Sequence, residues 1–189
     1  MDFNKNLVEL LFWKDIISGD EAAFSSIFKS YYKPLFNFGK LYTSDKSIIN
    51  DSIQDLFMDF WEKRKNLNPD VDVKSYIFGG FRNKLFKKIN QRSFIKQFGD
   101  DNVKVGFELS YEDIEIEKES DKLKVLKLNK ILNQLPPKQK EVIYLKFFKG
   151  LDNEQIAEVL KINYQSVKNH VYRSILVLRE KSKKEDHKN

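Results

Sequence analysis

The most constraining feature of the sequence is a stretch near its C-terminus, residues 136–179, where start and stop signals separate three helical segments. Pro136-Pro137 suits the first turn of a helix, and Gly150 suits the end of one. Asp152 and Gln155 have the spacing of a capping box, which begins a second helix. The pattern predicts two short helices followed, after a tight turn, by a longer one.

The longer helix begins after Asn163, its predicted N-cap, and it has two different sides. Its apolar stripe recurs at helical spacing through Val167, Val171, Ile175 and Leu178. The other side carries the polar residues Gln165, Lys168, Asn169, Tyr172 and Arg173. No acidic residue occurs from Lys161 to Arg179, so this side suits base edges and phosphates. This arrangement is typical of a helix-turn-helix.

The charges along the chain form two basic blocks separated by an acidic one, with a net charge of +6 at pH 7. Residues 82–96 hold basic residues and no acidic one, and the chain from Lys161 onward is basic again. Residues 100–121 are strongly acidic and show no sustained periodicity. Two basic blocks joined by an acidic segment indicate two nucleic-acid contacts on a flexible tether.

The chain lacks the residue patterns of common enzymes. It has no cysteine and no glycine-rich phosphate loop, and its two histidines, His170 and His187, have no partner at metal-ligand spacing. We therefore expect no catalysis, no metal and no cofactor. No signal peptide opens the sequence, and no apolar run approaches the roughly 20 residues that span a bilayer. A cytoplasmic protein without disulfides is expected.

Helical spacing also runs through the N-terminal half. Residues 1–14 predict a short amphipathic helix through Leu7, Leu10 and Leu11. A second helix is predicted from Asp20, with a break or kink at Pro34. A third, over residues 46–66, is capped by Thr43-Ser44-Asp45 and has a buried side made of Ile49, Ile53, Leu56, Phe57 and Phe60. No strand-like alternation occurs, so the predicted fold class is all-α.

The remaining side of the 46–66 helix carries an unusual mixture of residues: Asp51, Gln54, Asp55, Met58 and Trp61. An exposed methionine and an exposed tryptophan beside carboxylates favour a docking surface for another protein. Alternatively, Trp61 completes a small core. The pattern alone leaves both interpretations open.

A further helix is predicted over residues 73–96, with a buried stripe at Ile77, Phe78, Phe81, Leu85 and Ile89. A second stripe aligns Tyr76, Asn83 and Lys87. An aromatic ring, an amide and an ammonium on one face can stack on an unpaired base and hold its phosphate. The alternative interpretation is that Tyr76 belongs to the core and the lysines are solvated. It is favoured because charged helix faces are common.

These segments together resemble the extracytoplasmic-function (group 4) sigma factors of bacterial RNA polymerase, in a form similar to that of Bacteroidetes-type bacteria. Region 2.2 of that family is matched by DSIQDLFMDFWEKR, and regions 2.3 and 2.4 by VKSYIFGGFRNKLFKKINQR. Region 4 is matched by the helix-turn-helix segment that begins LPPKQKEVIYLKFFKG. The resemblance implies two small helical domains, residues 15–95 and 121–184, with a flexible acidic linker over residues 96–120.

The resemblance also implies three sets of contact residues. Docking on a coiled coil of the polymerase β′ subunit would use Asp51, Gln54, Asp55, Phe57 and Trp61. Capture of the melted −10 strand, with a flipped base, would use the loop of residues 65–74 and Tyr76, Asn83, Lys84 and Lys87. Reading of the −35 duplex would use Ser166, Lys168, Asn169, His170, Tyr172 and Arg173. Residues 138–148 would face the flap of the β subunit.

The implied partners are core RNA polymerase, promoter DNA and an anti-sigma factor, with no small-molecule substrate. Two residues depart from the family pattern. Lys161 stands at a turn position where glycine is usual, so a left-handed backbone there would be strained. His170 stands where arginine is common, which weakens a phosphate contact because histidine is mostly neutral at pH 7.

Two other functions fit parts of the pattern. The main alternative is a stand-alone helix-turn-helix regulator whose N-terminal half senses a ligand or dimerises, and which binds a two-fold site unaided. The other is a protein-interaction module without DNA reading, against which the polar face of residues 165–173 argues.

Overall fold

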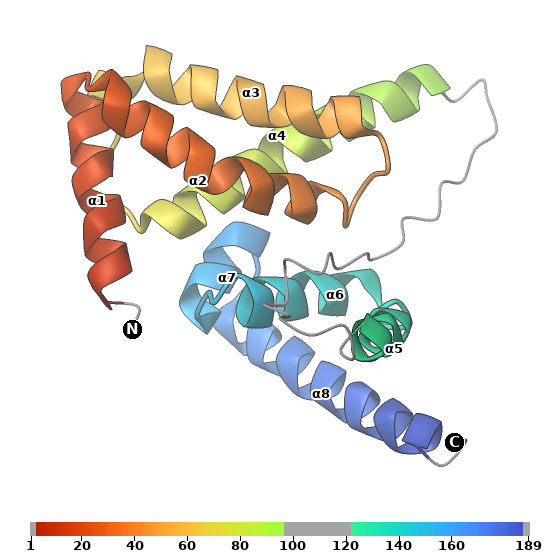
Figure 1. Ribbon diagram of the computed structural model, residues 1–189. Coiled ribbons are helices and arrows are strands. Elements are labelled where there is room, and N and C mark those ends of the chain that lie inside the picture. The colour runs from red at the N-terminus through yellow and green to blue at the C-terminus, as the bar shows by residue number, and fades with distance from the viewer. Residues whose placement is uncertain (1–2, 97–121, 187–189) are drawn as a thin grey trace. The chain divides into compact units, whose positions relative to one another are not determined.

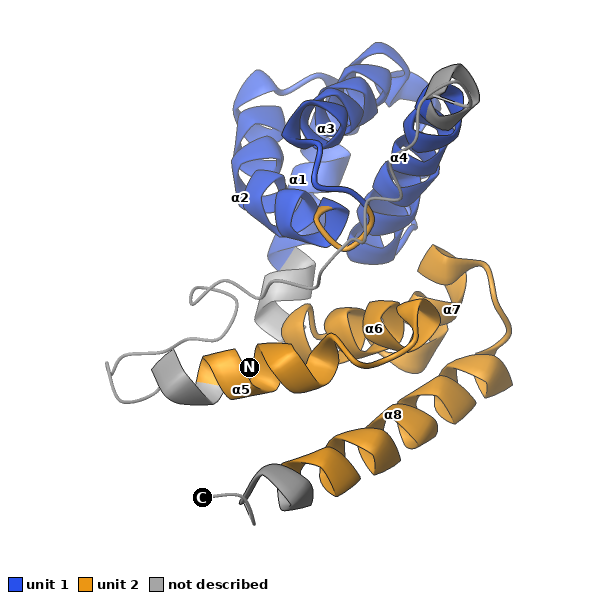
Figure 2. Cartoon of the chain, turned by 90° about the vertical axis from the view of Figure 1, so that its right-hand side faces the viewer, with its two compact units in different colours: residues 1–39, 43–103 blue, residues 40–42, 104–189 orange. Residues whose placement is uncertain are grey.

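The computed structural model describes residues 3–96 and 122–186. In these residues all regular secondary structure is helical (Figure 1). The all-α prediction is therefore confirmed. The predicted acidic linker lies almost wholly outside the described residues. The chain divides into two compact units, one of residues 1–39 and 43–103 and the other of residues 40–42 and 104–189 (Figure 2).

The N-terminal unit contains four helices: α1 (Phe3–Ser18), α2 (Glu21–Gly39), α3 (Lys46–Glu62) and α4 (Val73–Lys96). A short 3₁₀ helix, η1 (Arg64–Asn66), follows α3. Figure 1 shows α1 standing crosswise at one end of α2, α3 and α4. The core is apolar and aromatic, and the predicted buried residues of α3 and α4 are buried, except that Ile89 is half-buried.

Of the break or kink predicted at Pro34, the break does not occur, because α2 runs through the proline to Gly39. A proline inside a helix removes one backbone hydrogen bond. Here Tyr31 precedes the proline, Leu35 and Phe38 follow it, and all three are buried on the same side of α2. Packing on both sides of Pro34 therefore holds the helix together across the missing bond.

The N-terminal helix α1 belongs to the core of its unit, which the apolar spacing of residues 1–14 did not indicate. Leu11 is 55% exposed and Leu10 is half-buried, whereas Trp13 and Ile16 are fully buried. The Tyr31 hydroxyl of α2 donates a hydrogen bond to the Glu9 carboxylate at 2.8 Å, and burial raises the pKa of Tyr31 far above its ordinary value. The unit thus includes residues before position 15.

The C-terminal unit contains α5 (Lys122–Leu132), α6 (Pro137–Ile143), a π-helical turn η4 (Tyr144–Phe148), α7 (Asn153–Leu160) and α8 (Tyr164–Asp186). Its boundaries follow local signals in the sequence. The capping box is formed, since Asp152 and Gln155 each accept the other's backbone N–H at 2.8 Å. The Asn163 side chain accepts from the N–H of Ser166 at 2.7 Å. These predicted caps are confirmed.

The turn between α7 and α8 has the left-handed backbone anticipated at Lys161, with φ 54° and ψ 48°. A side chain with a Cβ atom is disfavoured in this region. The strained residue joins two helices that both pack in one unit: α8 contacts α7 and α6, and Val167 of α8 is fully buried. Packing on either side fixes the helix-turn-helix despite the lysine.

Candidate docking groove and nucleic-acid interfaces

An apolar groove of about 620 Å³ runs between α2 and α3 of the N-terminal unit. Its lining comprises Glu21, Phe24, Ser25, Phe28, Gln54, Phe57, Met58, Trp61 and Glu62. The Trp61 ring lies 5.0 Å from that of Phe24, and the Arg64 guanidinium lies over the Trp61 ring, 4.5 Å from its centroid. Met58 is 51% exposed. Exposed apolar side chains gathered in one hollow make the groove a candidate binding site.

The shape and charge of the groove suit an amphipathic helix. Its floor is aromatic, with the Phe57 ring 5.0 Å from the Phe28 ring and 6.0 Å from the Phe24 ring. Two carboxylates, Glu21 and Glu62, belong to its lining. A helix with an apolar stripe and basic residues beside it would fill the floor and pair with these carboxylates.

The predicted docking residues divide into three groups. Gln54 and Trp61 line the groove, and Phe57 forms its buried floor. Asp51 is half-buried one turn before the groove and lies 3.5 Å from the Ser47 hydroxyl. Asp55 faces the other way. Its carboxylate pairs with Lys88 of α4 at 2.8 Å, so the structure does not bring it to the groove.

Trp61 satisfies both interpretations that the sequence left open, because it packs against Phe24 and also borders the groove. The half of the groove contributed by α2 was missed. Its signal was present, since Phe24 and Phe28 stand one helical turn apart beside the acidic Glu21. Which side of α2 would meet α3 was not readable from that spacing.

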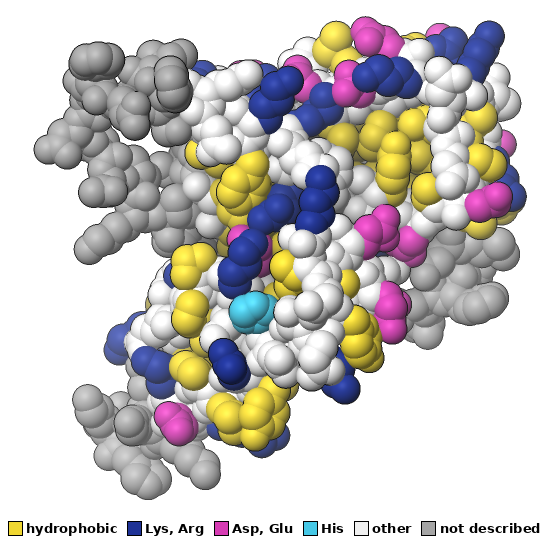
Figure 3. All heavy atoms as spheres, turned by 180° about the vertical axis from the view of Figure 1, so that it is seen from behind, with side chains coloured by type: hydrophobic (Ala, Val, Ile, Leu, Met, Phe, Trp, Pro, Cys, Tyr) yellow, Lys and Arg dark blue, Asp and Glu magenta, His cyan; other side chains and the backbone are white. Residues whose placement is uncertain are grey.

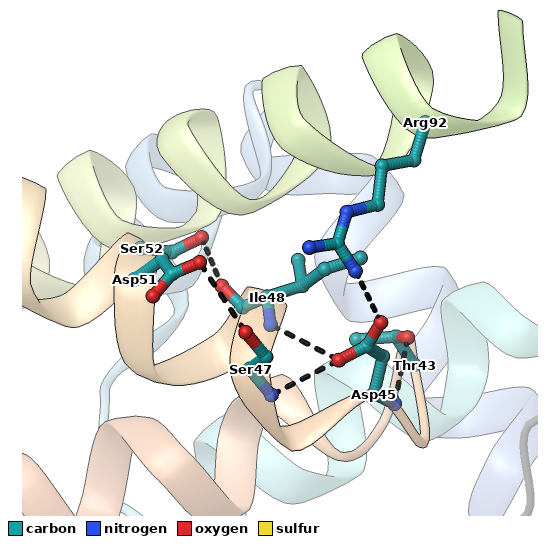
Figure 4. Close-up of polar contacts among 7 residues, drawn as sticks. All are labelled: Thr43, Asp45, Ser47, Ile48, Asp51, Ser52 and Arg92. Atoms are coloured by element: carbon teal, nitrogen blue, oxygen red, sulfur yellow. Dashed lines mark hydrogen bonds and ion pairs between the residues drawn. The ribbon is translucent and has the colours of Figure 1, made fainter. Parts of the chain in front are cut away.

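Acidic residues of α3 and its cap pair with basic residues of α4 along the length of the two helices. Besides Asp55 and Lys88, the Lys84 ammonium lies 2.6 Å from the Asp59 carboxylate, and Arg92 binds the carboxylate of Asp45 (Figure 4). Hydrogen bonding from Lys84 lowers the pKa of Asp59, against a smaller opposing effect of burial. Exposed pairs of this kind each contribute about 0–1 kcal/mol to stability.

The same pairing changes the expected nucleic-acid face of α4. Lys84, predicted to contact the −10 strand, directs its ammonium to Asp59 instead of outward. Asn83 and Lys87 are exposed on the predicted stripe. Tyr76 is half-buried, stacked on Phe60 at 5.6 Å. The core interpretation thus accounts for the buried part of Tyr76, and Asn83 and Lys87 lie about two and three turns further along the same helix.

The loop between η1 and α4 is held at several points. The Arg64 guanidinium donates to the carbonyl oxygen of Trp61 at 2.6 Å. Asp72 caps α4, accepting from the N–H of Ser75 at 2.8 Å. In the middle, the indole N–H of Trp13 donates to the carbonyl oxygen of Asn68 at 3.0 Å. This last contact reaches the predicted strand-capture loop from α1.

The predicted duplex-reading face of α8 is largely exposed to solvent. Gln165, Lys168, Asn169, Tyr172 and Arg173 are exposed, and Ser166 and His170 are half-buried. Tyr172 is 65% exposed. On the opposite side of α8, Val167 is buried, and Val171, Ile175 and Leu178 are half-buried. Ser174 is also buried, which the apolar pattern did not predict, and its hydroxyl donates to the carbonyl oxygen of His170 at 2.6 Å. Figure 3 shows Lys and Arg side chains interspersed with hydrophobic ones on the face it draws.

The segment of residues 138–148 is mostly buried within its own unit. Val142, Ile143, Tyr144 and Leu145 are buried, whereas Phe147 is exposed. Burial also lowers the pKa of Lys140. The segment therefore offers Phe147 and the charged side chains beside it, and little else, to a protein partner.

The described residues form neither a metal-binding cluster nor a membrane-spanning helix. Among them, no three His, Cys, Asp or Glu side chains lie close enough together to hold a metal ion. No helix in that part of the chain combines the length and apolar character needed to cross a membrane.

Comparison with known proteins gives concordant matches. The family model described as "Sigma-70, region 4" matches residues 126–177, which run from within α5 through α6 and α7 into α8. RNA polymerase sigma factor SigV of Bacillus subtilis (strain 168) is 26% identical over 161 residues, 84% of this chain and 87% of that protein. SigZ, an RNA polymerase sigma factor of the same organism, is 24% identical over 147 residues, 78% of this chain and 80% of that protein.

A solved structure shares the helical fold. It is the co-crystal structure of the sigma factor RpoE with the anti-sigma factor NepR from Bartonella quintana. The similarity has a TM-score of 0.60 with 21% sequence identity, and it covers 85% of this chain and 96% of that chain. The helical fold over most of the present chain therefore has a counterpart in a solved structure.

Proposed function

We propose that this chain, which belongs to the sigma-70 family of RNA polymerase sigma factors, directs bacterial RNA polymerase to promoters and helps to initiate transcription there. One observation carries the proposal: the exposed, acid-free face of α8 lies within the residues matched by sigma-70 region 4, while a separate unit carries an apolar groove. A chain that both docks on a protein and reads DNA needs two such surfaces.

We assign polymerase docking to the groove between α2 and α3. Gln54, Met58 and Trp61 would contact a helical coiled coil of the β′ subunit, with Glu21 and Glu62 meeting its basic residues. Phe57 would support the floor. Asp51 remains a candidate at the margin, and the contacts of Asp55 favour a role in joining α3 to α4. Phe147 supports a second, smaller contact with the β-subunit flap.

We assign −35 recognition to α8 and −10 recognition to α4 and the loop before it. Lys168 and Arg173 suit guanine or phosphate, and Asn169 suits adenine. For the melted −10 strand, Asn83 and Lys87 offer an exposed amide and an exposed ammonium on the predicted stripe that begins at Tyr76. The domains of this proposal are the α1–α4 unit and the α5–α8 unit, joined by the acidic segment of residues 96–120.

Such a factor performs no bond chemistry itself, because the polymerase synthesises the RNA. Its place of action would be the cytoplasm, where polymerase and chromosome are. RpoE of Bartonella quintana was crystallised with an anti-sigma factor. We propose that an anti-sigma factor regulates the present chain as well, by covering the groove or the α8 face.

The alternative of a stand-alone regulator makes a different prediction for the purified protein. The test is size-exclusion chromatography of the full chain with bacterial core RNA polymerase, together with duplex binding by the chain alone. We expect co-elution with core polymerase and weak unaided binding to DNA. Absence of co-elution, combined with tight binding of a dimer to a two-fold duplex site, would favour the stand-alone regulator.

A further inference from the structure

A tryptophan of the first helix reaches the loop before α4. Trp13 is fully buried, and its indole N–H donates to the carbonyl oxygen of Asn68 at 3.0 Å. Its ring meets Phe60 edge-on at 5.3 Å and Tyr76 at 5.4 Å. One side chain thus contacts the loop backbone, the end of α3 and the start of α4.

The loop that Trp13 contacts has little apolar burial of its own. Lys65, Asn66, Asn68, Pro69 and Asp70 are exposed, and Leu67 and Val71 are only half-buried. The side chain of Asn68 accepts from the N–H of Asp70 at 2.9 Å, which shapes the turn locally. A loop of this composition is expected to move unless specific hydrogen bonds hold it.

The contact at Asn68 restricts the backbone at the centre of the loop. The residue before a proline is confined to extended conformations, and Pro69 follows directly. The carbonyl oxygen of Asn68 then points to the Trp13 indole, whose buried N–H needs an acceptor. Breaking this bond would leave a buried donor without its partner and would release the loop.

We propose that Trp13 is a positioning residue for −10 strand capture. Its indole N–H fixes the loop so that the exposed amides of Asn66 and Asn68 are already placed for an unpaired base, and its ring supports Tyr76. Amide side chains read base edges, and groups fixed before binding lose less entropy on binding. The proposal rests on the proposed function, and it extends the −10 apparatus to α1.

The test compares the unaltered chain with Trp13→Phe, which keeps an aromatic ring against Phe60 but lacks the N–H donor. Ile16→Val is the matched control, because Ile16 is buried on the same helix and the loss of one methyl group there removes no hydrogen bond to the loop. Each full chain is assembled with core polymerase and selects from a promoter library randomised at the −10 and −35 elements. Hydrogen exchange of the free chains reports the loop of residues 63–72.

We expect Trp13→Phe to exchange faster in the loop and to bind its preferred −10 sequence about 3- to 10-fold more weakly, the range of one hydrogen bond. Its −35 selectivity and polymerase binding should match those of the unaltered chain, and Ile16→Val should match it throughout. If Trp13→Phe fails to fold, the exposed Pro69 offers a second variant. Pro69→Ala removes the restriction that the proline places on the backbone of Asn68, so it should also weaken −10 selectivity.

Two failures are distinguishable. If the unaltered chain enriches neither element with core polymerase, the proposed function itself is wrong. If it enriches both and Trp13→Phe keeps full −10 selectivity, the positioning role of Trp13 is overturned. Equal loss of −10 and −35 selectivity would also overturn it, because that result indicates general damage to the fold.

Discussion

A chain carrying Met58→Lys is expected to bind core RNA polymerase about 100-fold more weakly than the unaltered chain. Met58 lines the groove and is 51% exposed, so the lysine should leave the fold of the free chain intact. On docking, however, the new ammonium would be buried on the apolar floor, and its pairing with Glu62 one helical turn away would take that carboxylate from the basic residues of the partner. Placing a charge in such an interface costs several kcal/mol, and about 2.7 kcal/mol corresponds to 100-fold in Kd.

The measurement is the Kd of fluorescently labelled chain for core polymerase. Leu11→Lys is the matched control, because Leu11 is a similarly exposed apolar residue, 55% exposed, of the same unit and lies outside the groove lining. Met58→Leu tests whether apolar character suffices. Unchanged binding by Met58→Lys would show that the groove is not the docking site.

The double variant Lys168→Ala, Arg173→Ala is expected to lose promoter recognition while it keeps polymerase binding. Both side chains are exposed on α8, and a good base contact from either contributes about 1–3 kcal/mol. The holoenzyme should therefore bind a promoter with a −35 element at least 30-fold more weakly. For each residue that contacts phosphate instead of a base, the slope of log affinity against log salt should fall by about 0.9.

The comparison uses holoenzymes made with each chain, on promoter fragments with and without the selected −35 element. The double variant Lys127→Ala, Lys130→Ala is the charge-matched control, since both lysines are exposed on α5 of the same unit. The assignment of α8 fails if the double variant discriminates between the two fragments as well as the unaltered chain does.

The parts of the fold that could be predicted from the sequence depend on residues close together in the chain. The Asp45 cap, the capping box of Asp152 and Gln155, and the end at Gly150 all involve residues within one helical turn. Each motif satisfies its own backbone groups, so distant parts of the chain do not alter it. The exposed face of α8 followed from the same local spacing.

The parts that could not be predicted depend on residues far apart. Asp55 has a partner 33 positions away in Lys88, and nothing in its own helix distinguishes it from a docking carboxylate. Trp13 lies 55 positions from Asn68, and its burial depends on where α1 meets the loop. The continuity of α2 through Pro34 could not be predicted for the same reason, because tertiary packing outweighed a local helix-breaking tendency.

The central claim is that this chain confers promoter-specific initiation on core RNA polymerase. Run-off transcription tests it most directly, with core polymerase alone or with the full chain, on a linear template bearing a promoter that the holoenzyme has selected. The account predicts a transcript of defined length that requires both the chain and an intact −10 and −35 element. A transcript pattern that is the same with and without the chain would contradict it.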